Sequence, residues 1–296
     1  MGAMASTLFD QEYLNKLERL QLLARRLLRN RSAGEHLSLG KGVSLEFNEY
    51  RRYYPGDDFR LIDWNVFSRT EKLYLKLFSP EHDLNIYILL DHSASMGVGT
   101  PPKIQLARQV AGSLGYIALA QQDRVSLFGM GQDLQELVHY QRSKNQAFNL
   151  FQILEDIQCK GSGHFNETII RFMRRNIPGG LVVLVTDLLD PDGFDDGLKF
   201  LAASRFDVLV IHLLDESEIR VNVGGPYILF DVEGGGEQKI SLTPAIREKY
   251  HRRMLAYLDH AESFCRRHQI EYMRAFTSSS FEDIVLRYLR MGAYVH

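Results

Sequence analysis

The sequence has very little cysteine, with only Cys159 and Cys265 among its 296 residues. No CxxC pair occurs, and neither cysteine belongs to a complete Cys–His set with zinc-site spacing. This argues against a disulfide framework and against a zinc site, and it favours a reducing compartment. The N-terminus also lacks an apolar signal segment, so we expect a cytoplasmic protein.

Long apolar runs and an excess of one charge are missing as well. No run approaches the roughly 18 residues that a membrane span needs, so none is expected. The 35 Lys and Arg residues nearly balance the 37 Asp and Glu residues. Since nucleic-acid binding depends on a strong positive field, this balance argues against nucleic acid as the main partner. A hydrophobic content of 45% is ordinary for a globular protein with a sizeable core.

Complete catalytic motifs are absent too, because the sequence contains no G-x-S-x-G and no H-E-x-x-H. The dipeptide Gly40-Lys41 comes near a phosphate-binding loop, which requires four residues between its two glycines. Here five residues separate Gly34 from Gly40, and Gly42 follows the lysine where Ser or Thr is required. We therefore expect no nucleotide site at this point.

The most informative stretch that is present is NIYILLDHSASM, residues 85–96. Its apolar run predicts a strand buried on both faces, with Asp91 at the carboxyl end. In open α/β sheets, ligands bind beside the carboxyl ends of the strands. Ser93 and Ser95 alternate with Asp91, and three such oxygen donors suit Mg²⁺ or Mn²⁺. The same alternation predicts that His92 points away from them.

Beyond residue 84 the pattern alternates between strands and helices. A second apolar run, at residues 181–186, also ends at an aspartate, Asp187. Further strands are predicted at 124–128, 134–138, 207–214 and 270–276, with helices at 104–120, 147–157, 166–175, 194–204, 244–268 and 281–290. Glycines around 217–242 indicate a hairpin excursion. Strands joined by crossover helices predict an α/β fold with a mostly parallel sheet that is covered by helices.

Residues 1–80 are predicted to form an N-terminal extension of the main domain, which spans residues 81–296. A helix over about residues 8–31 carries a narrow apolar stripe of Tyr13, Leu17, Leu20, Ala24 and Leu27. The segment at residues 46–76 mixes charges of both signs around Trp64, which suggests paired charges around a buried indole. Because residues 31–80 contain too few apolar positions for a separate core, we expect the extension to pack on the main domain.

The two aspartate loops, DHSAS and TDLLD, together resemble the metal-ion-dependent adhesion site of the von Willebrand factor A fold. This resemblance implies that Asp91, Ser93 and Ser95 hold Mg²⁺ or Mn²⁺ directly and that Asp187 binds it through water. In that family a threonine from a middle loop adds another ligand. No matching loop threonine is evident here, since Thr168 is expected inside the next helix, and Ser162 is the expected substitute.

Three further segments, GKGxxxEF, YYPGDDFRLIDW and SRTEKLYLK, resemble one branch of that fold. This branch is a bacterial family of unknown function whose members often pair with MoxR-type AAA+ ATPases. The resemblance extends from about Arg31 to the C-terminus. It implies a von Willebrand factor A-like domain with an N-terminal helix-plus-strand extension, and a MoxR-type ATPase as partner.

The function expected from these features is a non-enzymatic binding module. A weakly bound Mg²⁺ or Mn²⁺ would offer an open position to a carboxylate of a partner protein. A different possibility is a metal-assisted phosphohydrolase that uses Asp91 with Asp187, with His164 as the better-placed candidate base. A scaffold with a degenerate metal site also fits the pattern, as does a loop whose Asp and Ser residues only cap a helix. The oligomeric state is left open by the sequence.

Overall fold

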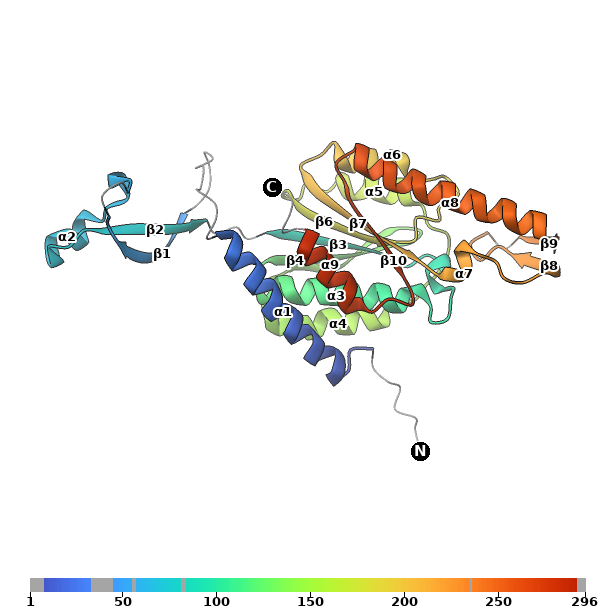
Figure 1. The fold of residues 1–296 in the computed structure, drawn as a ribbon, viewed down its shortest axis with the longest axis horizontal. Helices are drawn as coiled ribbons and strands as arrows, with labels where there is room; N and C mark the ends of the chain where they lie inside the picture. Colours follow the sequence, from blue (N-terminus) through green and yellow to red (C-terminus); the bar gives the residue numbers. More distant parts are fainter. Residues whose placement is uncertain (1–7, 33–44, 55–56, 81–83, 235, 292–296) are drawn as a thin grey trace, which may run out of the picture. The chain divides into compact units, whose positions relative to one another are not determined.

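The computed structural model describes residues 8–32, 45–54, 57–80, 84–234 and 236–291 (Figure 1). The chain divides into two compact units. One unit contains the N-terminal helix α1 (Gln11–Ser32) together with the chain from Leu84 onward, and the other is Gly34–Asp83.

The first unit is built on a six-stranded sheet with the order β10-β7-β6-β3-β4-β5. Its strands are β3 (Asn85–Asp91), β4 (Arg124–Met130), β5 (Leu134–Gln141), β6 (Gly180–Thr186), β7 (Phe206–Leu214) and β10 (Glu271–Phe276). All neighbours are parallel except the edge strand β5, which is antiparallel to β4. Numbered along the chain within this sheet, the order is 3-2-1-4-5-6, which is the doubly wound order. The predicted α/β fold with a mostly parallel sheet is confirmed.

Helices cover both faces of this sheet, as Figure 1 shows. The helices on one side are α1, α3 (Lys103–Ala120), α4 (Ala147–Asp156) and α9 (Phe281–Met291), and those on the other side are α5 (Phe165–Met173), α6 (Asp195–Ala202) and α8 (Pro244–Arg267). The alternation of side chains along a strand explains the two cores. In β3, Ile88 and Leu90 belong to the α3 side, whereas Tyr87 and Leu89 belong to the α5 side.

Helix α1 packs against α3 and α9 through the predicted apolar stripe. Tyr13, Leu17, Leu20 and Ala24 are all buried. The side chain of Leu27, the last residue of that stripe, lies outside the described residues. The Tyr13 hydroxyl donates to the backbone carbonyl of Gln109 in α3 at 2.7 Å. The helix therefore belongs to the core of the sheet domain.

The second unit contains an antiparallel pair, β1 (Leu45–Arg52) and β2 (Tyr74–Pro80), with a 3-10 turn η1 (Phe59–Leu61) and helix α2 (Trp64–Thr70) between them. The prediction of a buried indole is wrong, because Trp64 is 60% exposed. The neighbouring Asp63 is buried instead, and it caps α2 by accepting from the backbone N–H of Asn65 at 2.9 Å. That this unit packs on the sheet domain stays a prediction.

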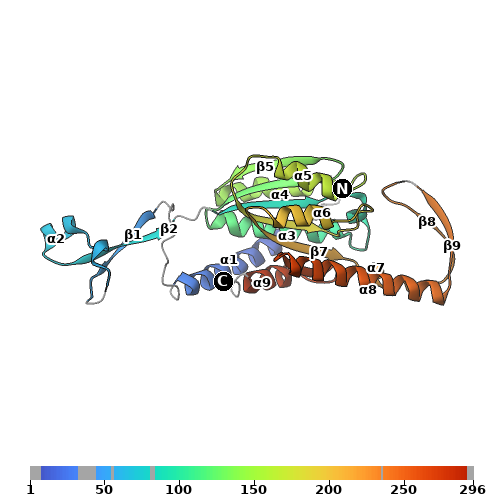
Figure 2. The ribbon, with the colours of Figure 1, turned by 90° about the horizontal axis from the view of Figure 1, so that it is seen from above.

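A hairpin of β8 (Gly225–Phe230) and β9 (Glu237–Leu242) lies where the sequence predicts an excursion from the sheet domain. It follows the short helix α7 (Glu216–Ile219) and leads into α8. In Figure 2 the hairpin curves back from the N-terminal end of α8 toward the sheet domain. Within the described ranges, no helix has the length and apolar character needed to cross a membrane.

Candidate metal centre

The predicted site lies where the strand order of the sheet reverses. Strand β3 is flanked by β4 on one side and β6 on the other, with Leu90 of β3 opposite Val185 of β6. Asp91 ends β3, Thr186 ends β6, and Asp187 follows directly. This is the crevice at which doubly wound sheets bind their ligands. The parallel topology therefore brings together two aspartates that are 96 positions apart in the sequence.

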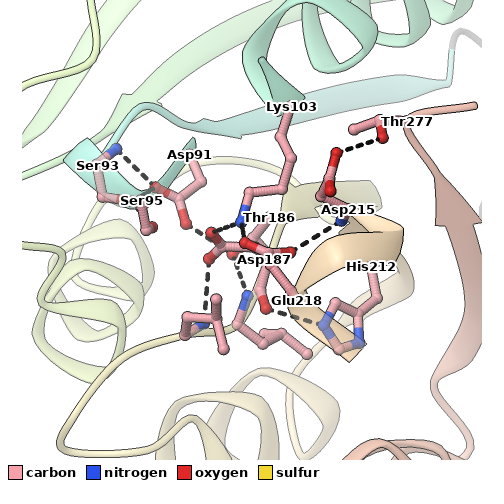
Figure 3. A network of polar contacts seen from close by, with 12 residues as sticks. Asp91, Ser93, Ser95, Lys103, Thr186, Asp187, His212, Asp215, Glu218 and Thr277 are labelled. Carbon is pink, nitrogen blue, oxygen red and sulfur yellow. Dashed lines mark hydrogen bonds and ion pairs between the residues drawn. The ribbon is translucent and has the colours of Figure 1, made fainter. Parts of the chain in front are cut away.

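The oxygens of the DxSxS loop lie close together (Figure 3). The Ser93 hydroxyl donates to Asp91 Oδ1 at 2.7 Å, and the Ser93 and Ser95 hydroxyls are 3.0 Å apart. All three side chains are buried. Mg²⁺ holds its oxygen ligands at about 2.1 Å in an octahedron, so adjacent ligands lie about 3.0 Å apart. The three donors thus fit a small divalent cation in both chemistry and spacing.

Thr186 orients the carboxylate of Asp91. Its hydroxyl donates to Asp91 Oδ2 at 2.7 Å and accepts from the backbone N–H of Leu188 at 3.0 Å. Burial, together with the nearby charge of Asp187, raises the pKa of Asp91 to about 7. A bound cation would favour the ionised form of this carboxylate, because an opposite charge stabilises it.

Asp187 is paired with a lysine that the sequence alone did not point to. Lys103 Nζ lies 2.9 Å from Asp187 Oδ2, and it also pairs with the carboxylate of Glu218. Burial lowers the pKa of Lys103, but these two carboxylates outweigh it and the pKa is raised overall, so the ammonium group stays charged. Glu218 is held in turn by the backbone N–H of Asp215, which donates to it at 2.8 Å.

His212, on β7, contacts the loop that follows β6. Its Nε2 lies 2.8 Å from the backbone carbonyl of Asp187, and its Nδ1 lies 2.7 Å from the hydroxyl of Tyr272. Burial lowers the pKa of His212 to about 4, so the ring is neutral at pH 7. Because a carbonyl can only accept, Nε2 carries the proton and Nδ1 accepts from Tyr272.

A small pocket opens beside these residues. Its volume is about 10 Å³, which is close to the space that one water molecule needs. Its lining includes Asp91, Ser93, Thr168, Asp187 and Glu233. Among the described residues, no three His, Cys, Asp or Glu side chains gather closely enough to hold a metal. Any cation here would therefore depend on hydroxyl groups and water as well as carboxylates.

The predicted middle-loop ligand, Ser162, does not line this pocket. Its hydroxyl lies 3.3 Å from Nε2 of His164. Thr168 does line the pocket and is buried, although it lies in the first turn of α5, as expected from the sequence. That Ser162 is a metal ligand stays a prediction. Of the two candidate hydroxyl groups in this segment, Thr168 is the one that lines the pocket.

Comparison with known families matches residues 49–259 to the family described as "Protein of unknown function DUF58". The chain belongs to this family. It is 28% identical over 253 residues to the "Uncharacterized protein Rv1480" of Mycobacterium tuberculosis, covering 84% of this chain and 80% of the relative. The family assignment predicted from the sequence motifs is thereby confirmed.

Solved structures with a similar fold include the conserved hypothetical protein BatB from Bacteroides thetaiotaomicron. That similarity has a TM-score of 0.45 at 17% identity and covers 71% of this chain and 98% of BatB. The manganese-loaded TRAP protein of Plasmodium vivax is similar over 43% of this chain and 56% of TRAP, with a TM-score of 0.33 at 18% identity.

Proposed function

We propose that this DUF58 chain is a cytoplasmic, non-enzymatic binding module that presents Mg²⁺ or Mn²⁺ to a carboxylate of a partner protein. The observation that carries the proposal is the spacing of the DxSxS oxygens. Asp91, Ser93 and Ser95 bring their oxygens to within 2.7 and 3.0 Å of one another at the switch point of the sheet. That spacing fits adjacent ligands of a small divalent cation.

The charges around the site explain why a partner would be needed. Asp91 supplies one negative charge, but the charge of Asp187 is shared with the Lys103 ammonium group 2.9 Å away. A site with few charged ligands holds Mg²⁺ weakly, because this ion gives up its waters reluctantly. A partner's carboxylate would add both a charge and a ligand. Metal and partner should then strengthen each other's binding by the same factor.

The resemblance to MoxR-associated proteins suggests that the partner is a MoxR-type AAA+ ATPase.

The positions of the histidines support a role in binding rather than in catalysis. His92 lines a separate pocket together with Gln132 and Lys160. His164 reaches the pocket of Asp91, but its Nε2 is engaged by the hydroxyl of Ser162. A hydrolase needs a nucleophile with a base in hydrogen-bond reach, whereas the hydrogen bonds of Asp91 go to Ser93 and Thr186.

The test is calorimetric titration of the full chain with Mg²⁺ and with Mn²⁺, first alone and then in the presence of the purified ATPase. We expect weak binding of the metal alone and tighter binding with the partner. Asp91→Asn should abolish the metal-dependent part of both measurements. Asp207→Asn is the matched control, because Asp207 is exposed on β7 and lies at the opposite end of that strand from His212.

Two results would count against the proposal. Equal partner affinity in EDTA and in excess Mg²⁺ would show that no metal bridge forms. Release of phosphate from p-nitrophenyl phosphate that is lost in Asp91→Asn but kept in Asp207→Asn would show that the site is catalytic.

A further inference from the structure

The turn of the β8–β9 hairpin carries an acidic residue, Glu233, that differs from its neighbours. Within residues 226–239, every described residue except Glu233 is exposed. Asp231 makes two hydrogen bonds within this segment. Asp231 Oδ1 accepts from the backbone N–H of Glu233 at 2.9 Å, and the backbone N–H of Asp231 donates to the carbonyl of Gly236 at 2.8 Å. Glu233 is thus the least exposed described residue of this segment.

Glu233 reaches the pocket of the candidate metal centre. It lines the same 10 Å³ cavity as Asp91, Ser93 and Asp187. Its carboxyl group lies near Ser95 and the backbone N–H of Gly163, and both favour its ionised form. A carboxylate from a distant part of the chain therefore lines the same cavity as two of the proposed metal-binding residues, Asp91 and Ser93.

A cation would further stabilise this carboxylate, because burial and the charge of Asp187 disfavour its ionised form. Asp91 and Asp187 line the same cavity, so a third carboxylate experiences repulsion as well as partial burial. Lys103 is already paired with Asp187 and Glu218. A divalent cation in this cavity, which has about the volume of one water molecule, would compensate the charge of Glu233.

We propose that Glu233 is the chain's own carboxylate ligand for the cation, held in the position that a partner's carboxylate would take. This inference rests on the proposed function and adds a regulatory contact to it. The hairpin then acts as an internal competitor of the partner. When the turn swings away the cation is open to the partner, and when the turn is in place the partner must displace Glu233 first.

The hairpin itself is suited to such displacement. An isolated pair of strands is only marginally stable in water, and the side chains of Tyr227, Ile228, Leu229 and Phe230 are between 40% and 66% exposed. Few packing contacts therefore oppose movement of the turn. A partner needs only to outcompete one carboxylate to shift the population toward the open form.

The experiment compares the full-length wild type with Glu233→Gln, Glu237→Gln and Asp91→Asn. Glu237 is the matched control, because it is an exposed glutamate in the same hairpin. Calorimetric titration with Mn²⁺ alone should show affinity lowered about tenfold or more in Glu233→Gln, unchanged in Glu237→Gln and lost in Asp91→Asn. Water-proton relaxation of bound Mn²⁺ should report more exchangeable waters in Glu233→Gln than in the wild type.

Hydrogen exchange, measured at Mn²⁺ concentrations that saturate each variant, gives a second readout that does not depend on affinity. Mn²⁺ should slow exchange of the backbone amides of β8 and β9 in the wild type and in Glu237→Gln, but not in Glu233→Gln. Equal Mn²⁺ affinity and equal hairpin protection in Glu233→Gln and Glu237→Gln, with binding still lost in Asp91→Asn, would overturn this inference and leave the proposed function standing. Failure of the wild type to bind Mn²⁺ would overturn both.

Discussion

The Lys103 ammonium group lies 2.9 Å from the carboxylate of Asp187, and both side chains are almost completely buried. A charged pair in such surroundings loses much hydration energy, which its mutual attraction and further hydrogen bonds must offset. Glu218 supplies the second contact of the lysine, and the backbone N–H of Leu189 donates to Asp187 at 3.1 Å. The pair therefore fixes the loop after β6 while reducing the charge that Asp187 can offer to a cation.

Replacing Lys103 by methionine should strongly destabilise the fold. The variant keeps most of the side-chain volume but leaves the buried carboxylate of Asp187 without its partner. Breaking a buried pair in this way typically costs about 3–5 kcal/mol in the free energy of unfolding. Urea denaturation measures this directly. Lys16→Met is the control, since both ion pairs of Lys16 lie at the surface, and it should unfold close to wild type. Equal midpoints for the two variants would contradict the role given to Lys103.

Thr186→Val should reduce stability and weaken the binding of metal. The substitution preserves the shape of the side chain but removes the donor to Asp91 Oδ2 and the acceptor for the N–H of Leu188. A buried N–H left without an acceptor costs about 1–3 kcal/mol. Thr186→Ser retains the hydroxyl, so it should preserve Mn²⁺ affinity better than the valine variant does. If the two variants bound Mn²⁺ equally, the hydroxyl of Thr186 would not be orienting Asp91.

The stability of the metal-free protein should depend on His212 below neutral pH. Burial lowers the pKa of His212 to about 4 from an ordinary value of 6.5. Between these values the unfolded chain takes up a proton that the folded chain does not, so stability falls as the pH falls from about 6.5 to 4. The full difference corresponds to about 3 kcal/mol.

The matching measurement is urea denaturation in EDTA of the wild type and of His212→Gln at several pH values. Asp91, with its raised pKa, titrates in the opposite direction, but it is present in both proteins and its contribution cancels in the comparison. The stability of the wild type relative to the variant should decrease between pH 6.5 and 4. Parallel curves over that range would show that His212 does not titrate as its burial requires.

The part of the site that the sequence predicts is the part that is local. Asp91, Ser93 and Ser95 follow one buried strand, and their alternation alone places their oxygens near a common point. Asp187 could be added because parallel strands end at one edge of the sheet. The strands and helices of the sheet domain could also be predicted, because apolar runs and amphipathic stripes involve residues only a few positions apart in the sequence.

The residues that sequence reasoning missed reach the site from distant elements. Lys103 lies in the first turn of α3, where a lysine after two prolines is typical of an exposed position, yet it is fully buried. Glu218 and Glu233 come from the segment that was predicted only as an excursion. Nothing in the spacing of these residues indicates which charges meet, because that depends on the tertiary placement of α7 and of the hairpin turn.

Leu17→Ala should test whether helix α1 is an integral part of the sheet domain. Leu17 is fully buried where α1 packs against α3 and α9, whereas Leu22 in the same helix is 66% exposed. Removing a buried leucine side chain costs about 2–5 kcal/mol, because it loses apolar burial and leaves a cavity. Leu22→Ala should change stability by no more than about 0.5 kcal/mol. Both variants retain helix propensity, so the difference between them isolates packing.

Urea denaturation of these two variants, followed by circular dichroism, should show a single transition for each, with a lower midpoint only for Leu17→Ala. A wild-type midpoint for Leu17→Ala, with helical signal lost in a separate early phase, would mean that α1 unfolds independently of the sheet.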